Sequence, residues 1–354
     1  MASSVVPKYS GTVGQTEAGA NARVGCPKGI ARGRVLRHVW GLLVAGSCLL
    51  WAFHDVNWRT AWAHLRAAQW QWTLAAAACE LSSYAWDATR WVWLLRPIGR
   101  IRWKDALRAI YAGLLANQIF PVRLGEVARA YALSRWAALR LEVLVPSLLL
   151  CRLLDGLAVV VVAGAAAAWA PLPADLVRPA GWFAISLLCM WAALAVFVYR
   201  DPSRIRAWGY RRSGAGPLCH LKRLSVQIAE GLAALRSPGL LGRAAATTLI
   251  FLIFQVAAFW LAMQAYGLQL DLVSAGVVFL ILHVGTAIPS APANVGSFQF
   301  FTVVGLSLYG VEKSVAAGFS VFAFAVLTAP LSAAGLLSLA RSGLRLDSTL
   351  TETH

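Results

Sequence analysis

Long apolar stretches recur along most of this chain, and they limit its fold more than any other sequence feature. A helix needs about 20 such residues to cross a hydrocarbon core. The stretches predict an all-α, polytopic membrane protein with about six full spans. These spans are expected over residues 36–53, 70–95, 141–169, 180–199, 244–266 and 314–340.

The composition supports the same class. Of the 354 residues, 59% are hydrophobic and 13% are charged, whereas soluble domains contain about 25% charged residues. The net charge of +17 comes from basic residues, which cluster in the loops between apolar stretches, as is typical of cytoplasmic loops beside anionic headgroups. No soluble basic domain is visible, so we do not expect nucleic-acid binding.

Cysteine and histidine spacing gives no indication of a metal or a cofactor. The six cysteines form no CxxC pair, and the six histidines form no HExxH pattern, so neither disulfides nor a metal site is expected. We expect three regions: a disordered, basic, cytoplasmic tail over 1–34 that is not cleaved, a transmembrane domain over 35–341, and a polar tail over 342–354.

Two apolar regions, 105–135 and 272–310, are interrupted. Basic segments at 96–108 and 200–243 predict cytoplasmic loops, and the weakly charged segments 170–179 and 267–271 predict outer loops. Each full span takes the chain to the other side of the membrane. For the basic loops to lie inside, residues 105–135 must begin and end on the cytoplasmic side, and residues 272–310 must begin and end on the outer side. The two regions therefore read as re-entrant hairpins in an inverted arrangement, which is typical of secondary transporters. The protein is expected in a bacterial-type plasma membrane, with both termini on the cytoplasmic side.

Helix breakers mark both hairpins. The motif "PVRLG" begins at Pro121 and "PANVG" begins at Pro292, so both read P-x-x-[L/V]-G. Proline removes a helical hydrogen bond and glycine permits a sharp turn. Backbone groups freed in this way must line a protein-walled or wet cavity. The predicted helix-break residues are Pro121, Gly125, Pro289, Pro292 and Gly296.

A half-helix that starts after Pro121 would point its N-terminal amides into that cavity, where Arg123 and Arg129 would add full positive charges. A lipid phosphate suits such a site, because the planar fork of arginine binds phosphate with two hydrogen bonds. Alternatively, Glu126 pairs with both arginines at helical spacing.

Other polar residues lie within the apolar segments, and each has a functional and a structural interpretation. Charges at membrane depth cost about 2.5 kcal/mol or more on insertion scales, so they are expected to have partners. Asp87 with Arg90 and Arg152 with Asp155 are one helical turn apart; Glu80 is the candidate for a protonatable coupling group, and Asp87 and Arg90 are further candidates. The predicted headgroup-binding residues are Asn117, Arg123, Glu126, Arg129, Arg152, Asp155, Asn294 and Gln299.

Four segments give the chain a family resemblance from about residue 40 to 340: "SYAWDATRWVWLLRP", "NQIFPVRLGEVARAYAL", "CRLLDGLAVV" and "IPSAPANVGSFQFFTVVGLSLYGV". The chain resembles the transmembrane region of lysylphosphatidylglycerol synthetases, the flippase-like family. The resemblance implies a multi-span module with re-entrant helices that translocates or handles lipids. Where family members often carry acidic residues, this chain has Cys151 and Gln299. The soluble aminoacyl-transfer domain is not visible after residue 340, so lipid aminoacylation is not expected.

The leading hypothesis is a lipid transporter that moves an anionic phospholipid or a polyisoprenoid or hopanoid-type lipid between leaflets. The first alternative is a polyprenyl-phosphate-dependent glycosyltransferase, for which Asp55 in "HDVNW" is the candidate base. The second is a non-catalytic partner that docks a lipid-synthesis enzyme through the basic loop 200–236.

Overall fold

The computed structural model describes residues 43–120, 124–169, 181–182, 185–186, 189–192, 237–286 and 292–341. These residues belong to one compact unit, His38–His354. The two predicted tails, 1–34 and 342–354, lie outside the described residues, as do the basic loop 200–236 and much of the predicted span 180–199.

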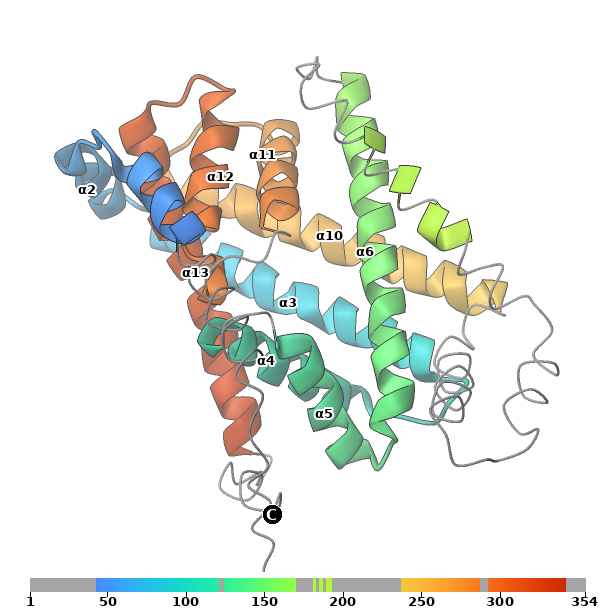
Figure 1. The fold of residues 1–354 in the computed structure, drawn as a ribbon. Coiled ribbons are helices and arrows are strands. Elements are labelled where there is room, and N and C mark those ends of the chain that lie inside the picture. Colours follow the sequence, from blue (N-terminus) through green and yellow to red (C-terminus); the bar gives the residue numbers. More distant parts are fainter. Residues whose placement is uncertain are drawn as a thin grey trace, which may run out of the picture. The chain divides into compact units, whose positions relative to one another are not determined.

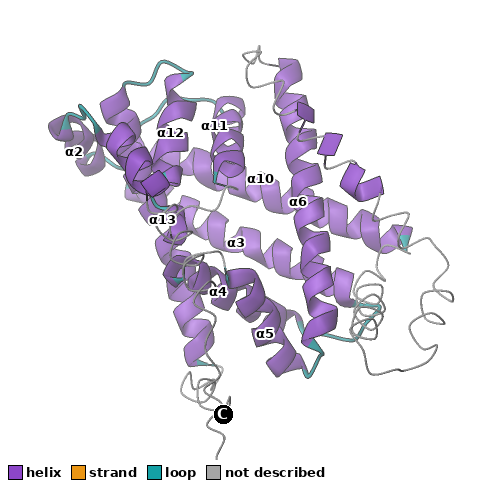
Figure 2. Ribbon diagram, in the orientation of Figure 1, coloured by secondary structure: helices purple, strands orange, loops and turns teal. Residues whose placement is uncertain are grey.

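The described elements are all helical, so the predicted all-α class is confirmed, and Figure 2 draws no strand among the described residues. The chain order is Leu43–Phe53, α2 (Trp58–Arg66), α3 (Trp70–Leu95), α4 (Trp103–Ile119), α5 (Gly125–Ala137), α6 (Leu141–Trp169), α10 (Pro238–Tyr266), α11 (Leu272–Gly285), the 3-10 turn η2 (Pro292–Asn294), α12 (Ser297–Ser307) and α13 (Lys313–Ala340).

Three described helices are long and apolar enough to cross a membrane: Leu141–Gly164 within α6, α10 and α13. The 26-residue helix α3 has the length, about 39 Å at 1.5 Å per residue, but it carries Glu80, Asp87 and Arg90. α10 begins six residues before the predicted start at 244. The predicted number of spans and the re-entrant topology stay predictions.

Helices α3 and α10 lie side by side and run antiparallel (Figure 1). Near the start of α3, the Gln69 amide donates to the carbonyl of Ala265, 2.9 Å away. Further along, the Cys79 thiol donates to the carbonyl of Phe254. The residue numbers of the partners in α10 decrease as those in α3 increase, so the two helices run in opposite directions. Polar groups on both helices therefore face a shared interface.

The first interrupted region forms a helical hairpin. α4 ends at Ile119 and α5 begins at Gly125, so the helix breaks where the sequence predicts. Pro121 and Arg123 lie outside the described residues. The side-chain oxygen of Asn117 accepts from the Gly125 amide at 2.7 Å and satisfies one N–H group of the first turn. A Cβ added at Gly113 would lie 2.6 Å from the Gly125 carbonyl oxygen, so the two helices touch through glycines.

The second interrupted region has the same form. α11 ends at Gly285 and α12 begins at Ser297. Pro289 lies outside the described residues, and Pro292 begins η2. Gly296 has φ +90 and its amide donates to the side-chain oxygen of Gln299 at 2.7 Å, so a polar side chain again satisfies an amide at the break. The helices pack antiparallel, with Gly285 against the Phe301 ring.

Each hairpin also packs against a long helix from the other half of the chain. α4 contacts α13, and α11 contacts α6. At the first of these contacts, a Cβ added at Gly335 would lie 2.6 Å from the Tyr111 carbonyl oxygen. The two halves are thus interlocked around the α3–α10 pair rather than packed as separate bundles.

Candidate functional site

Three helices bring together charged residues of both signs beside the first helix break. The pairs Asp87 and Arg90 on α3, Glu126 and Arg129 on α5, and Arg152 and Asp155 on α6 form a closed ring in which acidic and basic side chains alternate. We call these six residues the charge ring. Its formal charge is zero, because three carboxylates face three guanidinium groups.

Each carboxylate of the charge ring pairs with two arginines. Asp87 accepts from Arg90 through Oδ1 at 2.5 Å and faces Arg129 Nη1 through Oδ2 at 3.2 Å. Glu126 lies 3.9 Å from the same Arg129 nitrogen and also pairs with Arg152. Asp155 pairs with Arg90 and lies 3.4 Å from Arg152 Nη1.

One side of the charge ring is buried and the other is open. Asp87, Arg90 and Arg129 are 3%, 2% and 6% exposed, whereas the Arg152 side chain is 56% exposed. Arg90 also donates to the Thr248 hydroxyl of α10 at 3.2 Å. Burying an unpaired charge is strongly unfavourable, so mutual pairing explains how α3 tolerates these groups.

Arg129 retains an unused hydrogen-bonding edge. Its Nη1 faces the carboxylates, but within the described part of the chain its buried Nε and Nη2 atoms have no hydrogen-bond partner. The Nε–H and one Nη–H of a guanidinium group point in parallel, which matches two oxygens of a phosphate or carboxylate. The guanidinium carbon lies 4.3 Å from the centre of the Trp91 ring, a cation–π contact that holds the group in place.

A cavity of about 100 Å³ lies against the charge ring. All six ring residues line it, together with side chains from α4, α10 and α11: Asn117, Gln255 and His283. A cavity of this volume has room for a small group such as a phosphate and is too small for a whole lipid. A lipid headgroup would have to enter it while the acyl chains stay outside.

Residues 38–335 match the family model described as the lysylphosphatidylglycerol synthase TM region. The chain belongs to this family. The resemblance inferred from the four sequence segments is thereby confirmed, and the match takes in the charge ring and both helix breaks. No curated protein and no solved structure matches the chain. Membership in the lysylphosphatidylglycerol synthase TM family, together with the apolar helices, identifies a membrane protein of lipid metabolism.

Glu80 lies outside the charge ring in this family member. It is 7% exposed, and its carboxylate is hydrogen-bonded to Tyr84 and Gln255. The Gln255 amide also lies 3.3 Å from the Tyr84 hydroxyl. Within the described ranges, no basic side-chain nitrogen lies within 4.0 Å of the Glu80 carboxylate, so Glu80 forms no ion pair there. Glu80 is therefore a buried acid in a neutral polar setting, and its two partners both line the cavity.

The remaining predicted site residues divide by location. Asn117 lies at the cavity and caps α5. Gln299 bonds the backbone at the second break, and neither it nor Asn294 lines the cavity. Arg123 lies outside the described residues. No group of three His, Cys, Asp or Glu side chains that could hold a metal occurs within the described segments.

Sequence reasoning missed several residues of the site. Tyr84, Thr248 and Gln255 contact the charge ring or Glu80, and Trp91 stacks on Arg129. Thr248 and Gln255 lie seven residues apart on α10, two turns along one face. Polar residues at helical spacing in an apolar helix are the signal that could have found them.

Proposed function

We propose that this protein moves a phosphate-bearing lipid between the leaflets of a bacterial-type plasma membrane. The main supporting observation is the unpartnered Nε–Nη2 edge of Arg129, a buried residue that lines a cavity of phosphate size beside a helix break. A buried cation with two free parallel donors is completed by an anion with two oxygens. An anionic phospholipid and a polyisoprenoid phosphate both supply that chemistry.

The energetics favour binding at this edge over displacement of a carboxylate. Breaking a buried ion pair by removing one partner costs about 3–5 kcal/mol. A phosphate at Nε and Nη2 leaves the pairs from Arg129 to Asp87 and Glu126 in place. The charge ring thus keeps the arginine oriented while the edge stays free. Ion pairing and ligand binding, which the sequence left as alternatives, are compatible in this arrangement.

Our proposed topology has six spans and two re-entrant hairpins in an inverted arrangement, with both termini cytoplasmic. Three features support it: α3 and α10 are antiparallel, both hairpins break at a glycine amide bonded by a side chain, and each hairpin packs on a long helix of the other half. Inverted repeats with broken helices provide two opposed access routes to one central site.

Glu80 is the group that we assign to proton coupling. A carboxyl group buried without a basic partner is stable in its neutral form. Loss of its proton would place a negative charge next to Tyr84 and Gln255, which line the cavity. That charge would disfavour a bound phosphate, so proton release and headgroup release would be linked.

We propose a carrier rather than an enzyme. The candidate base of the glycosyltransferase hypothesis, Asp55, is paired with His54 at 2.5 Å, its side chain is 80% exposed, and it does not line the central cavity. Sugar transfer that is lost in an Asp55→Asn variant would instead favour the enzyme. Docking of a lipid-synthesis enzyme on the basic loop 200–236 is a second proposal, which concerns a partner. That loop lies outside the described residues.

The test is headgroup accessibility in vesicles of phosphatidylcholine with a trace of fluorescent phosphatidylglycerol, quenched from outside. Native protein should raise the fraction of probe that becomes quenchable. Arg129→Gln should reduce the rate at which the probe moves to the outer leaflet at least tenfold. Arg135→Gln is the matched control, because Arg135 is exposed on the same helix. Equal rates for native protein, Arg129→Gln and empty vesicles would refute the proposal.

A further inference from the structure

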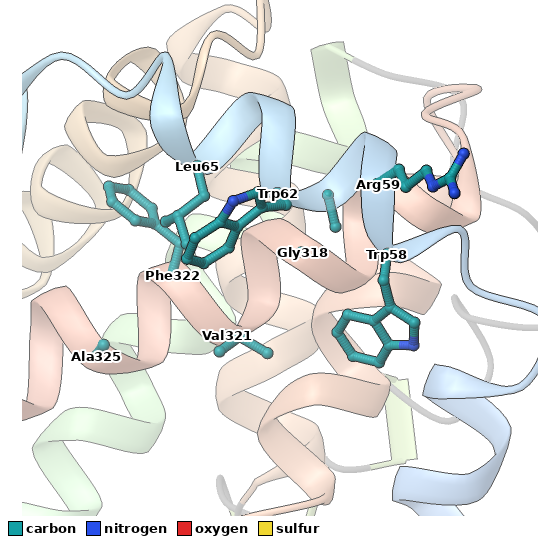
Figure 3. Close-up of a pocket in the computed structure, with 9 residues that line it drawn as sticks. Trp58, Arg59, Trp62, Leu65, Gly318, Val321, Phe322 and Ala325 are labelled. Carbon is teal, nitrogen blue, oxygen red and sulfur yellow. The ribbon is translucent and has the colours of Figure 1, made fainter.

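A second cavity lies between α2 and α13, at the surface and apart from the charge ring. Its volume is about 620 Å³, within the range of about 300–1,000 Å³ typical of small-molecule sites. Figure 3 shows its lining side chains, which come from these two helices. We call it the α2–α13 groove.

The groove is preformed because α2 is fixed to its neighbours. The Asn57 amide donates to the Ser314 hydroxyl at 3.1 Å, and the Tyr266 hydroxyl donates to the Ala61 carbonyl at 3.0 Å. A Cβ added at Gly318 would lie 2.8 Å from the Cβ of Ala61, so α2 rests directly on the α13 backbone. These contacts between protein groups therefore set the shape of the groove.

Several apolar side chains of the groove are exposed. Trp58 and Trp62 are 57% and 53% exposed, and Val321 on α13 is 45% exposed. Trp58, Trp62 and Leu65 follow the spacing i, i+4, i+7, which gathers them on one face of α2. In a membrane protein, such a concave apolar surface is suited to an acyl chain.

Positive charge accompanies this apolar face. α2 contains Arg59 and Arg66 and no acidic residue. Arg59 lines the groove, and in Figure 3 its guanidinium group extends away from the Trp62 ring. Arg66 lies over that ring, 5.3 Å from its centre. A short helix with tryptophan and leucine on one face and arginines beside them is typical of membrane interfaces, where such arginines attract anionic lipid.

We infer that the α2–α13 groove is a binding site for a membrane phospholipid with an anionic headgroup. One acyl chain lies along Trp62 and Val321, and the phosphate meets Arg59 at the rim. This site is separate from the central cavity, and it stands whether or not the protein transports lipid.

Photo-crosslinking tests the site in the full chain. The protein is placed in phosphatidylcholine nanodiscs with a phosphatidylglycerol that carries a diazirine in one acyl chain, and crosslinked peptides are identified by mass spectrometry. We expect the label on α2 and on the 318–325 part of α13. Ala325→Trp, which fills the groove at an exposed position, should lower that label at least fivefold. Leu336→Trp is the control, since Leu336 is 59% exposed on the same helix outside the groove.

The headgroup part of the inference has its own comparison. Phosphatidylglycerol should label the groove at least threefold more than a phosphatidylcholine probe, and Arg59→Gln should remove this preference while Arg135→Gln keeps it. Equal labelling of the Ala325→Trp and Leu336→Trp variants would overturn the site. Equal labelling by the two lipids in the native chain would overturn the anionic assignment. Arg129→Gln should leave all of these labels unchanged, which separates this site from the transport proposal.

Discussion

Replacement of Asp87 by asparagine is the sharpest test of the charge ring. Asp87 is 3% exposed, and it bridges Arg90 and Arg129, whose side chains are 2% and 7% exposed. Asp87→Asn preserves size but leaves the ring with a net charge of +1 in its most buried part. Removing one partner of a buried pair costs about 3–5 kcal/mol. Because two arginines lose the same carboxylate, we expect at least the lower value.

The measurement is the free energy of unfolding in mixed detergent micelles, titrated with a denaturing detergent. Glu142→Gln is the matched control, because Glu142 accepts from Arg140 at 2.8 Å while both side chains are about half exposed. Pairs of that kind contribute about 0–1 kcal/mol. The double variant Asp87→Asn with Arg129→Gln restores a neutral ring and should recover part of the loss. If Asp87→Asn costs no more than Glu142→Gln, the ring is not held in a low-dielectric interior and the reasoning fails.

Two further predictions concern the hairpin and the buried acid. Gly125→Ala should destabilise the protein by about 1–3 kcal/mol, because its Cβ would overlap the Gly113 carbonyl and the Asn117 side chain. Gly242→Ala, with nothing within 4 Å, is the control for the same unfolding assay, and equal effects would contradict the close packing. Glu80→Gln should keep lipid movement in vesicles but remove its response to an imposed proton gradient. A full response in that variant would exclude Glu80 as the coupling group.

The helices were largely predictable from the sequence because apolar length and helix breakers are local signals. The break between α4 and α5 follows from "PVRLG", and the break before α12 follows from "PANVG". Boundaries were less well predicted where proline and glycine occur within a helix, as at the start of α10, where Pro238 occupies a first-turn position that tolerates proline.

The charge ring was predictable only in parts. The spacing i, i+3 identifies Asp87 with Arg90, Glu126 with Arg129, and Arg152 with Asp155 as local pairs. The links between these pairs depend on how α3, α5 and α6 pack, and no local pattern reports that. The free edge of Arg129 likewise depends on which acceptors approach it in space. Spacing suggests which charges pair but gives no indication of which buried donors, such as Arg90 Nε and the Nε and Nη2 atoms of Arg129, are left without a partner in the described residues.

The charge ring also has a consequence for biogenesis. Asp87 and Arg90 are synthesised before any residue of α5 or α6, so α3 emerges from the ribosome before the four residues that complete the ring. In the proposed topology α3 crosses the bilayer, and at about 2.5–3.5 kcal/mol for each charge at mid-membrane, Asp87 and Arg90 together oppose insertion by roughly 5–7 kcal/mol. Insertion of α3 into the bilayer should therefore be delayed until α6 has been translated, so that the nascent helices leave the translocon together.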